Sequence, residues 1–260
     1  MKISEQSRHN PPMLTVETTS AVAKITLARP EVRNALDDNL IAKLTEAIKT
    51  LPTHVRAVIL SGEGQSFCAG GDLEWMRRAA NYSKEENRQD AINLANLFQA
   101  ICDCPAVIIA KVQGHAFGGG FGLVAACDVA ISDPNTLFAL SEVRLGLVAA
   151  TISRFVIPKI GAGHSRALMT TGEAFGTEKA LRIGLIHEVT EDLDAMIDKK
   201  LKAILAAGPK SVATSKWLAQ QPLMGSETSA ELLAKVRAGD EAKEGIAAFL
   251  EKRKPGFSQP

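Results

Sequence analysis

The chain has 260 residues with 30 basic and 29 acidic side chains, and its formal net charge is +1. This balance excludes the strong overall field that would attract nucleic acid or an anionic membrane surface. The length suits one large domain, or a domain with an appendage, and provides enough chain for a sizeable core. No apolar run is long enough to cross a bilayer, because Lys, Asp or Gly interrupts the most apolar stretches.

The cysteines and the N-terminus indicate the compartment. Four cysteines stand at positions 68, 102, 104 and 127, without a Cys-x-x-Cys pair, which indicates reduced thiols and no zinc site. Residues 1–12 contain no apolar stretch and end in two prolines, so they are interpreted as a flexible leader and not as a signal peptide. We therefore expect a cytoplasmic protein without a metal, whose partners include neither nucleic acid nor membrane.

The first hundred residues alternate between strand and helix patterns. Strands are predicted at 13–17, 22–27 and 55–60 from apolar and β-branched runs, and helices at 38–50 and 84–103 from apolar residues at helical spacing. Strand, helix and strand in succession predict an α/β core.

Two glycine-bearing turns follow the same pattern of strand, turn and helix. The buried strand predicted at 106–112 leads to Gly118–Gly120 and then to an apolar helix at 121–127. Earlier, the segment 57–73 runs from a strand to a glycine turn and ends near Asp72, which can cap a helix. Such turns leave backbone N–H groups free at the positive end of a helix, where a developing oxyanion can bind. A lone triple glycine also occurs in simple tight packing, but two such turns can supply one N–H each to a single hole.

The second half of the chain is mostly helical. A short strand at 128–132 and a turn at Asp133 precede the loop that holds Glu142. The predicted helices are at 151–160, 163–171, 177–183, 192–206, 209–219, 226–238 and 241–253. The last of them are amphipathic and are expected to form an appendage that packs on a neighbour.

Four segments together resemble the enoyl-CoA hydratase/isomerase (crotonase) superfamily. They are RPEVRNAL at 29–36, SFCAGGDL at 66–73, GGGFGL at 118–123 and SEVRLGL at 141–147. The resemblance runs from about residue 13 to the segment 244–254. It implies an α/β fold of the ClpP/crotonase type, with a spiral of ββα units over 13–200. It further implies a helical region over 201–260 that builds homotrimers or dimers of trimers.

The resemblance also implies the chemistry. Coenzyme A would be part of the substrate, with no separate cofactor. The backbone N–H groups of Ala69 and Gly119 would form an oxyanion hole for an enolate. Hydratases of the superfamily commonly carry two glutamates, and the corresponding positions here are Gly122 and Glu142. A single carboxylate can still move the proton, with a second water standing where the first glutamate is missing. Without the motif, Glu142 would be interpreted as an exposed carboxylate paired with Arg144.

Further residues are assigned to the ligand by the same resemblance. The residues expected around the nucleotide, the pantetheine and the thioester are Val32, Arg33, Ala35, Gly71, Asp72, Leu73 and Gly118. Trp75 and Met76 are expected beside the acyl chain, with core packing as the alternative. Phe249 and Lys252 match positions that reach the adenine, in some members from a neighbouring subunit. Arg154 is a candidate partner for an acyl carboxylate.

The leading hypothesis is a hydratase of α,β-unsaturated acyl-CoA, with a branched or carboxylated chain as one option. The motifs are most similar to bacterial methylglutaconyl-CoA and isohexenylglutaconyl-CoA hydratases. Such an enzyme would act in the breakdown of fatty acids or branched-chain amino acids. Two alternatives stay open: a Δ3-Δ2-enoyl-CoA isomerase that uses the same glutamate, and a non-catalytic member that binds acyl-CoA or serves as a scaffold.

Overall fold

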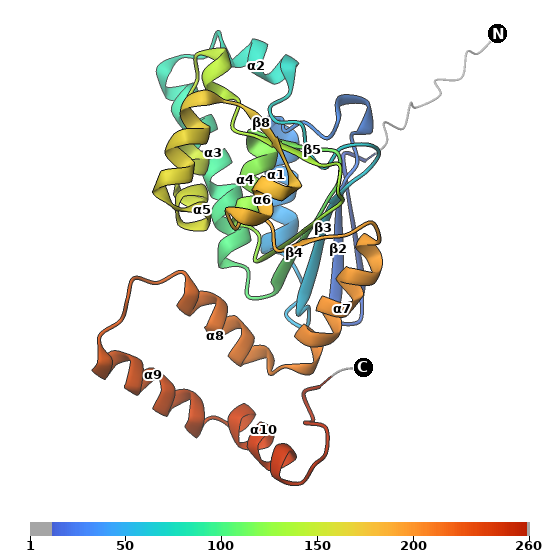
Figure 1. The fold of residues 1–260 in the computed structure, drawn as a ribbon, viewed down its shortest axis with the longest axis vertical. Helices are drawn as coiled ribbons and strands as arrows, with labels where there is room; N and C mark the ends of the chain where they lie inside the picture. Colours follow the sequence, from blue (N-terminus) through green and yellow to red (C-terminus); the bar gives the residue numbers. More distant parts are fainter. Residues whose placement is uncertain (1–11, 259–260) are drawn as a thin grey trace, which may run out of the picture.

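The computed structural model describes residues 12–258 and shows an α/β protein with two sheets (Figure 1). Within these residues the larger sheet has the strand order β1-β2-β3-β4-β6-β9, and the smaller one β5-β7-β8. The strands are β1 (Leu14–Thr19), β2 (Val22–Leu27), β3 (Ala57–Gly62), β4 (Val107–Val112), β5 (His115–Phe117), β6 (Val129–Ser132), β7 (Leu137–Ala139), β8 (Ala174–Gly176) and β9 (Glu188–Val189). The predicted fold class is confirmed. All but the last residue of the expected leader lies outside the described part.

The helices follow the strands in the order that the sequence indicates. They are the short 3-10 helices η1 (Pro30–Val32) and η2 (Glu142–Leu145) and the α-helices α1 (Asp38–Lys49), α2 (Leu73–Ala79), α3 (Lys84–Asp103), α4 (Gly119–Ala126), α5 (Ala150–Thr171), α6 (Thr177–Arg182), α7 (Leu193–Ala206), α8 (Pro209–Ala219), α9 (Ser226–Ala238) and α10 (Asp240–Leu250). Capping fixes several starts: the Asp37 side chain accepts from Leu40 N, and Ser83 and Glu86 form a capping box before α3.

The larger sheet is covered on both faces. Alternate residues of β3 point to opposite sides, because the side-chain period of a strand is two. Val58 and Leu60 belong to the main core with α1, α3, α4 and α5, whereas Ile59 packs with Ile197 of α7 on the other face. Strands buried on both faces read as continuous apolar runs, and this is why the sequence predicted them.

Some predicted elements are confirmed and others needed correction. The two helices expected at 151–160 and 163–171 are confirmed as the two parts of α5, which a kink at Gly161 (φ 78°, ψ 155°) separates. The last helix ends at Leu250 and not at residue 253. The strands β5, β7 and β8 were not predicted, whereas α2 begins directly after Asp72, the residue that the sequence indicated as a helix cap. Each of these strands has three residues, and its pairing with distant chain segments gives no local periodicity to detect.

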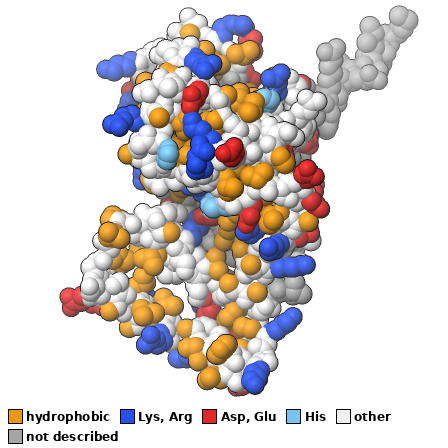
Figure 2. Space-filling model, in the orientation of Figure 1, with side chains coloured by type: hydrophobic (Ala, Val, Ile, Leu, Met, Phe, Trp, Pro, Cys, Tyr) orange, Lys and Arg blue, Asp and Glu red, His pale blue; other side chains and the backbone are white. Residues whose placement is uncertain are grey.

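The helices α8, α9 and α10, here called the C-terminal arm, project from the core (Figure 1). The arm begins after the predicted boundary at 200/201, which falls inside α7. No residue of α8 or α9 is buried, and large apolar side chains are exposed on the arm (Figure 2), among them Leu223, Leu233 and Phe249. Across residues 12–258, no helix combines the length and the apolar character needed to span a bilayer.

Candidate active site

The two glycine turns meet. Cys68 and Ala116 form a bridge between the turns, with Cys68 N donating to His115 O at 3.0 Å and Phe117 N donating to Cys68 O at 3.0 Å. The contact is close because Gly120 has no side chain: a Cβ at this position would lie 2.2 Å from Cys68 O, which only glycine allows. The structure therefore brings together the two turns that the sequence singled out.

The oxyanion donor assigned to Ala69 is wrong. Its N–H already donates to Arg33 O at 3.0 Å. Next to this contact, Leu36 N donates to Gly70 O at 2.8 Å and Asp72 N donates to Leu36 O at 2.9 Å. In such a parallel bridge the N–H of the residue between these two partners points to the opposite side. That residue is Gly71, and its N–H has no acceptor within residues 12–258.

The second predicted donor, Gly119, agrees with the structure. Gly119 is the first residue of α4, so its N–H has no partner inside the helix, and no other acceptor is found among the described residues. Gly118 before it holds φ 48° and ψ −113°, a conformation that disfavours any other residue. The N–H groups of Gly71 and Gly119 are thus the donors that the two turns leave free.

The Glu142 carboxyl lies beside Gly118, the residue that precedes the Gly119 donor. A Cβ on Gly118 would lie 3.5 Å from Glu142 Oε1 and 3.8 Å from the Cα of Gly70. Glu142 is half-buried, and its Oε2 is a buried oxygen without a hydrogen-bond partner in the described chain. Burial raises the pKa of this carboxyl. The described ion pairs do not include one between Glu142 and Arg144, so the surface-pair interpretation has no support.

We expect Glu142→Gln to increase the free energy of unfolding at pH 7 relative to the wild type. The Glu142 carboxyl of the unfolded chain ionises near pH 4.3, whereas that of the folded protein ionises at a higher pH. The folded wild type therefore loses stability as the pH rises from the lower of these two pKa values through the higher one. Below both pKa values the carboxyl is protonated in both states, so the stability gained by Glu142→Gln disappears. Urea unfolding between pH 4 and pH 8 measures this difference. Glu46→Gln on the exposed face of α1 serves as the control, and a gain that shrinks with rising pH contradicts the prediction.

The position expected for a first glutamate is closed. A Cβ on Gly122 would lie 2.6 Å from Ile152 Cγ2 and 3.0 Å from two ring carbons of Phe98, and all three residues are buried. Apolar side chains therefore fill the space in which a glutamate or a second water was expected. The sequence showed that position 122 has no glutamate, but it did not show that the distant residues Ile152 and Phe98 fill the space beside it.

Gly122→Glu is expected to destabilise the protein by about 3 kcal/mol or more, since it overfills the core and buries a carboxylate. Gly163→Glu is the matched control, because Gly163 is an exposed helical glycine with no atom within 4 Å of its Cβ position. Urea unfolding of both variants tests this. Equal midpoints for the two variants would contradict the filled pocket.

The predicted nucleotide loop lies beside the first turn. Val32 and Arg33 are exposed and Ala35 is buried, while Asn34 donates to Glu63 O and Ser66 O at 2.8 and 2.7 Å. This buried amide holds the loop although Arg33 and Asn34 both have positive φ (53° and 56°). The hydrogen bond from Ala69 N to Arg33 O thus holds this loop next to the first turn, with Val32 and Arg33 exposed.

The residues after the first turn include Trp75 and Met76, which the resemblance assigned to the acyl chain. Asp72 caps α2, and Leu73 is 74% exposed. Trp75 is buried and donates from Nε1 to Asp90 Oδ1 at 3.1 Å. A Cβ on Gly71 would contact both Trp75 and Met76 at 3.6 Å, so these two side chains lie beside the Gly71 donor.

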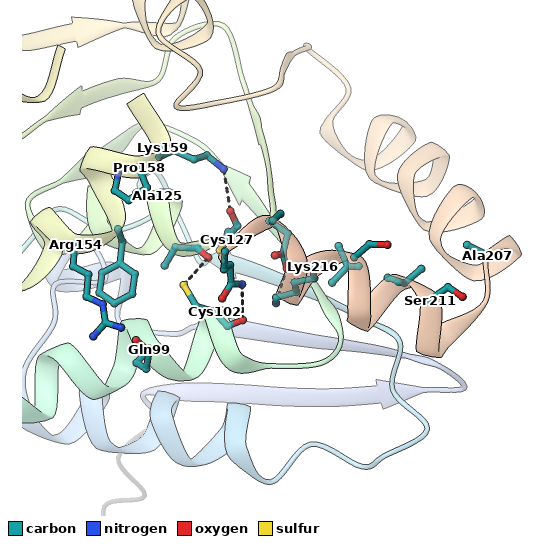
Figure 3. Close-up of a pocket in the computed structure, with 18 residues that line it drawn as sticks. Gln99, Cys102, Ala125, Cys127, Arg154, Pro158, Lys159, Ala207, Ser211 and Lys216 are labelled. Carbon is teal, nitrogen blue, oxygen red and sulfur yellow. Dashed lines mark hydrogen bonds and ion pairs between the residues drawn. The ribbon is translucent and has the colours of Figure 1, made fainter. Parts of the chain in front are cut away.

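Three other assigned residues do not reach this cluster within one chain. Phe249 is 82% exposed on α10, and Lys252 follows it, at the far end of the arm from the turns (Figure 1). Arg154 lines a separate cavity of about 810 Å³ between the core and α8, where it extends toward Gln99 (Figure 3). Neither Glu142 nor any residue of the two glycine turns lines that cavity, so the structure does not place Arg154 beside the expected acyl chain.

The cysteines and the other potential metal ligands of residues 12–258 do not form a second candidate site. Cys68, Cys102, Cys104 and Cys127 are all free thiols, and burial raises the pKa of each. Residues 12–258 contain no group of His, Cys, Asp and Glu that could hold a metal ion. Hydrogen bonding between Ser66 Oγ and His115 Nδ1 at 3.2 Å agrees with a structural role for this histidine.

Comparisons with known proteins agree with this geometry. Residues 17–260 match the profile described as enoyl-CoA hydratase/isomerase. The (E)-benzylidenesuccinyl-CoA hydratase of Thauera aromatica is 31% identical over 264 residues, covering 94% of this chain and 98% of the relative. The crotonyl-CoA hydratase of Syntrophomonas wolfei is 30% identical over 253 residues, covering 93% and 96%. The crystal structure of an enoyl-CoA hydratase from Shewanella pealeana superposes with a TM-score of 0.91 at 34% identity, covering 94% and 96%.

Proposed function

The chain belongs to the enoyl-CoA hydratase/isomerase family, and we propose that it adds water across the α,β double bond of an enoyl-CoA thioester. One observation carries the proposal: the half-buried Glu142 carboxyl lies beside Gly118, near two turns whose Gly71 and Gly119 N–H groups have no acceptor among residues 12–258. A carboxylate beside two convergent donors is the arrangement that enolate chemistry needs.

The proposed steps use only these groups. The thioester oxygen accepts hydrogen bonds from Gly71 N and Gly119 N, which stabilise negative charge as it develops there. Ionised Glu142 removes a proton from a water whose oxygen bonds to the β-carbon, and the α,β double bond becomes an enolate. The protonated carboxyl then returns that proton to the α-carbon. The raised pKa of Glu142 suits a group that must both take and give a proton near neutral pH.

A second candidate is double-bond isomerisation. One carboxylate can remove a proton at the α-carbon of a 3-enoyl-CoA and return it at the γ-carbon, without water. The apolar contacts of Gly122 with Ile152 and Phe98 favour this candidate, because no second carboxylate is needed for it. Those contacts also support the third candidate, a non-catalytic acyl-CoA-binding member.

A product assay separates the candidates. The protein is incubated in H₂¹⁸O with crotonyl-CoA, 3-methylglutaconyl-CoA and a 3-enoyl-CoA, and products are identified by mass. Hydration adds labelled water, and isomerisation moves the double bond without label. If CoA esters bind without turnover, the binding-only candidate holds. The preferred ester also tests the proposed acyl class, in which a branched or carboxylated chain is supported by the relative named for benzylidenesuccinyl-CoA.

We also propose that the protein assembles as a trimer, alone or in pairs. The C-terminal arm exposes Leu223, Leu233 and Phe249, and α8 and α9 bury no residue, so a neighbouring subunit would cover this surface. Sedimentation velocity measures the assembly. In such a trimer Phe249 and Lys252 would reach the nucleotide end of a neighbour's ligand.

A further inference from the structure

A buried guanidinium lies behind the nucleotide loop and the first glycine turn. Arg29 donates from Nη1 to Ala35 O at 2.7 Å and from Nη2 to Asp72 Oδ2 at 2.8 Å. Its Nη1 also lies 3.2 Å from Asp37 Oδ2. The side chains of Arg29, Asp37 and Asp72 are 13%, 12% and 8% exposed, so the cluster is largely shielded from water.

The two carboxylates are both helix caps. Asp37 accepts from Leu40 N at the start of α1, and Asp72 Oδ1 accepts from Glu74 N and Trp75 N at the start of α2. Although burial alone would raise it, the pKa of Asp72 is lowered, because Trp75 N and the Arg29 guanidinium both donate to the carboxylate. One cation therefore fixes the starts of two helices against each other.

Arg29 contacts residues that are adjacent to, or packed against, both proposed oxyanion donors. Asp72 directly follows Gly71 in the chain, so the Arg29 contact with Asp72 fixes the peptide next to the Gly71 donor. Ala35, whose carbonyl Arg29 binds, directly precedes Leu36. Leu36 is bonded to Gly70 and Asp72 through its backbone, and a Cβ on Gly119 would lie 2.7 Å from Leu36 Cδ1. Arg29 thus restrains the Gly71 turn and the side chain that packs against Gly119.

We propose that Arg29 is a positioning residue for the oxyanion hole, which holds the Gly71 and Gly119 N–H groups at the separation that the thioester oxygen requires. The inference rests on the proposed function of these two donors. Arginine suits this position because its planar fork presents separate nitrogens to a carbonyl and two carboxylates, whereas a lysine ammonium carries all its donors on one nitrogen. Because the donors are backbone groups, their alignment depends on such restraints and not on their own side chains.

The chain offers a matched control for this inference. Arg78 on α2 donates to Asp38 of α1 at 2.7 Å, so this pair joins the same two helices as Arg29 does. The side chains of Arg78 and Asp38 are 50% and 47% exposed, and neither lies in the turn. Arg78→Gln therefore removes a cation between α1 and α2 without touching the cluster around Gly71.

The experiment measures kcat, KM and the carbonyl band of bound substrate. Kinetics are compared for wild type, Arg29→Gln, Arg29→Lys, Asp72→Asn and Arg78→Gln with crotonyl-CoA. The infrared band of ¹³C-carbonyl crotonyl-CoA is recorded for each substitution in a Glu142→Gln background, in which the bound ester is not consumed. Asp72→Asn keeps an oxygen that can cap α2 and loses the ion pair and the hydrogen bond with Arg29, so it tests the inference even if Arg29→Gln does not fold.

Arg29→Gln and Asp72→Asn are expected to lower kcat by about 10- to 100-fold with KM changed less than about threefold. The carbonyl band should return toward its position in water, Arg29→Lys should be intermediate, and Arg78→Gln should match the wild type. A lowered kcat with an unchanged band would overturn the inference, because it would show a merely structural role. A wild-type band that is not shifted on binding would overturn the proposed hole itself, and the inference with it.

Discussion

Glu142→Gln is expected to lower kcat for enoyl-CoA hydration by about 10²- to 10⁴-fold, the range typical of a lost general acid-base group. Glutamine has nearly the same shape and keeps the contacts of the side chain near Gly118, but it cannot take a proton from water. KM should change little, because the donors at Gly71 and Gly119 still bind the thioester. Steady-state hydration of crotonyl-CoA, followed by the loss of enoyl absorbance, measures both constants.

The pH dependence provides an independent check on this assignment. Burial raises the pKa of Glu142, so the acid limb of kcat/KM should fall at a pH above the usual glutamate range. Glu46→Gln, on the exposed face of α1, should leave both the rate and the limb unchanged. If Glu142→Gln keeps more than about a tenth of the wild-type kcat, another group moves the proton and the proposed mechanism fails.

Gly119→Pro is expected to lower kcat by about 10²- to 10³-fold relative to Gly119→Ala. Both substitutions add a Cβ that approaches Leu36 Cδ1, but only proline removes the N–H. Position 119 is the first residue of α4, where proline is compatible with a helix and where the N–H has no intrahelical partner. The comparison therefore tests the Gly119 N–H, which proline replaces with a ring carbon.

Crotonyl-CoA hydration and urea unfolding of both Gly119 variants are measured together. The two are expected to unfold at similar urea concentrations, so a difference in kcat cannot come from stability. Equal rates for Gly119→Pro and Gly119→Ala would show that the Gly119 N–H does not contact the reacting oxygen. A rate loss in Gly119→Ala alone would instead point to the displaced Leu36 side chain.

The sequence predicted the long elements well, and the physical reason is their local periodicity. The helix at Lys84–Asp103 was predicted with both ends correct, since its apolar residues keep helical spacing. The parallel strands β3 and β4 were evident as continuous apolar runs. The three-residue strands β5, β7 and β8 were missed, because partners far away in the chain determine them.

The candidate site likewise has features that the sequence predicted and features that only the structure shows. The glycine turns, Glu142 and the loss at Gly122 are local features, and the resemblance assigned them from motifs alone. The donor was misplaced at Ala69, because only the hydrogen bond from its N–H to Arg33 O shows that this group is occupied. Ile152 and Phe98 beside Gly122 belong to different helices, so no pattern along the chain links them to that position.

The sequence by itself therefore determined the α/β class, the two turns and the single carboxylate, because residue type and short-range spacing fix these features. The tertiary structure decided which backbone N–H groups stay free, what fills the space beside Gly122, and that Arg29 joins the caps of two helices. These features depend on contacts between segments dozens of residues apart, and such contacts exist only after the chain has packed.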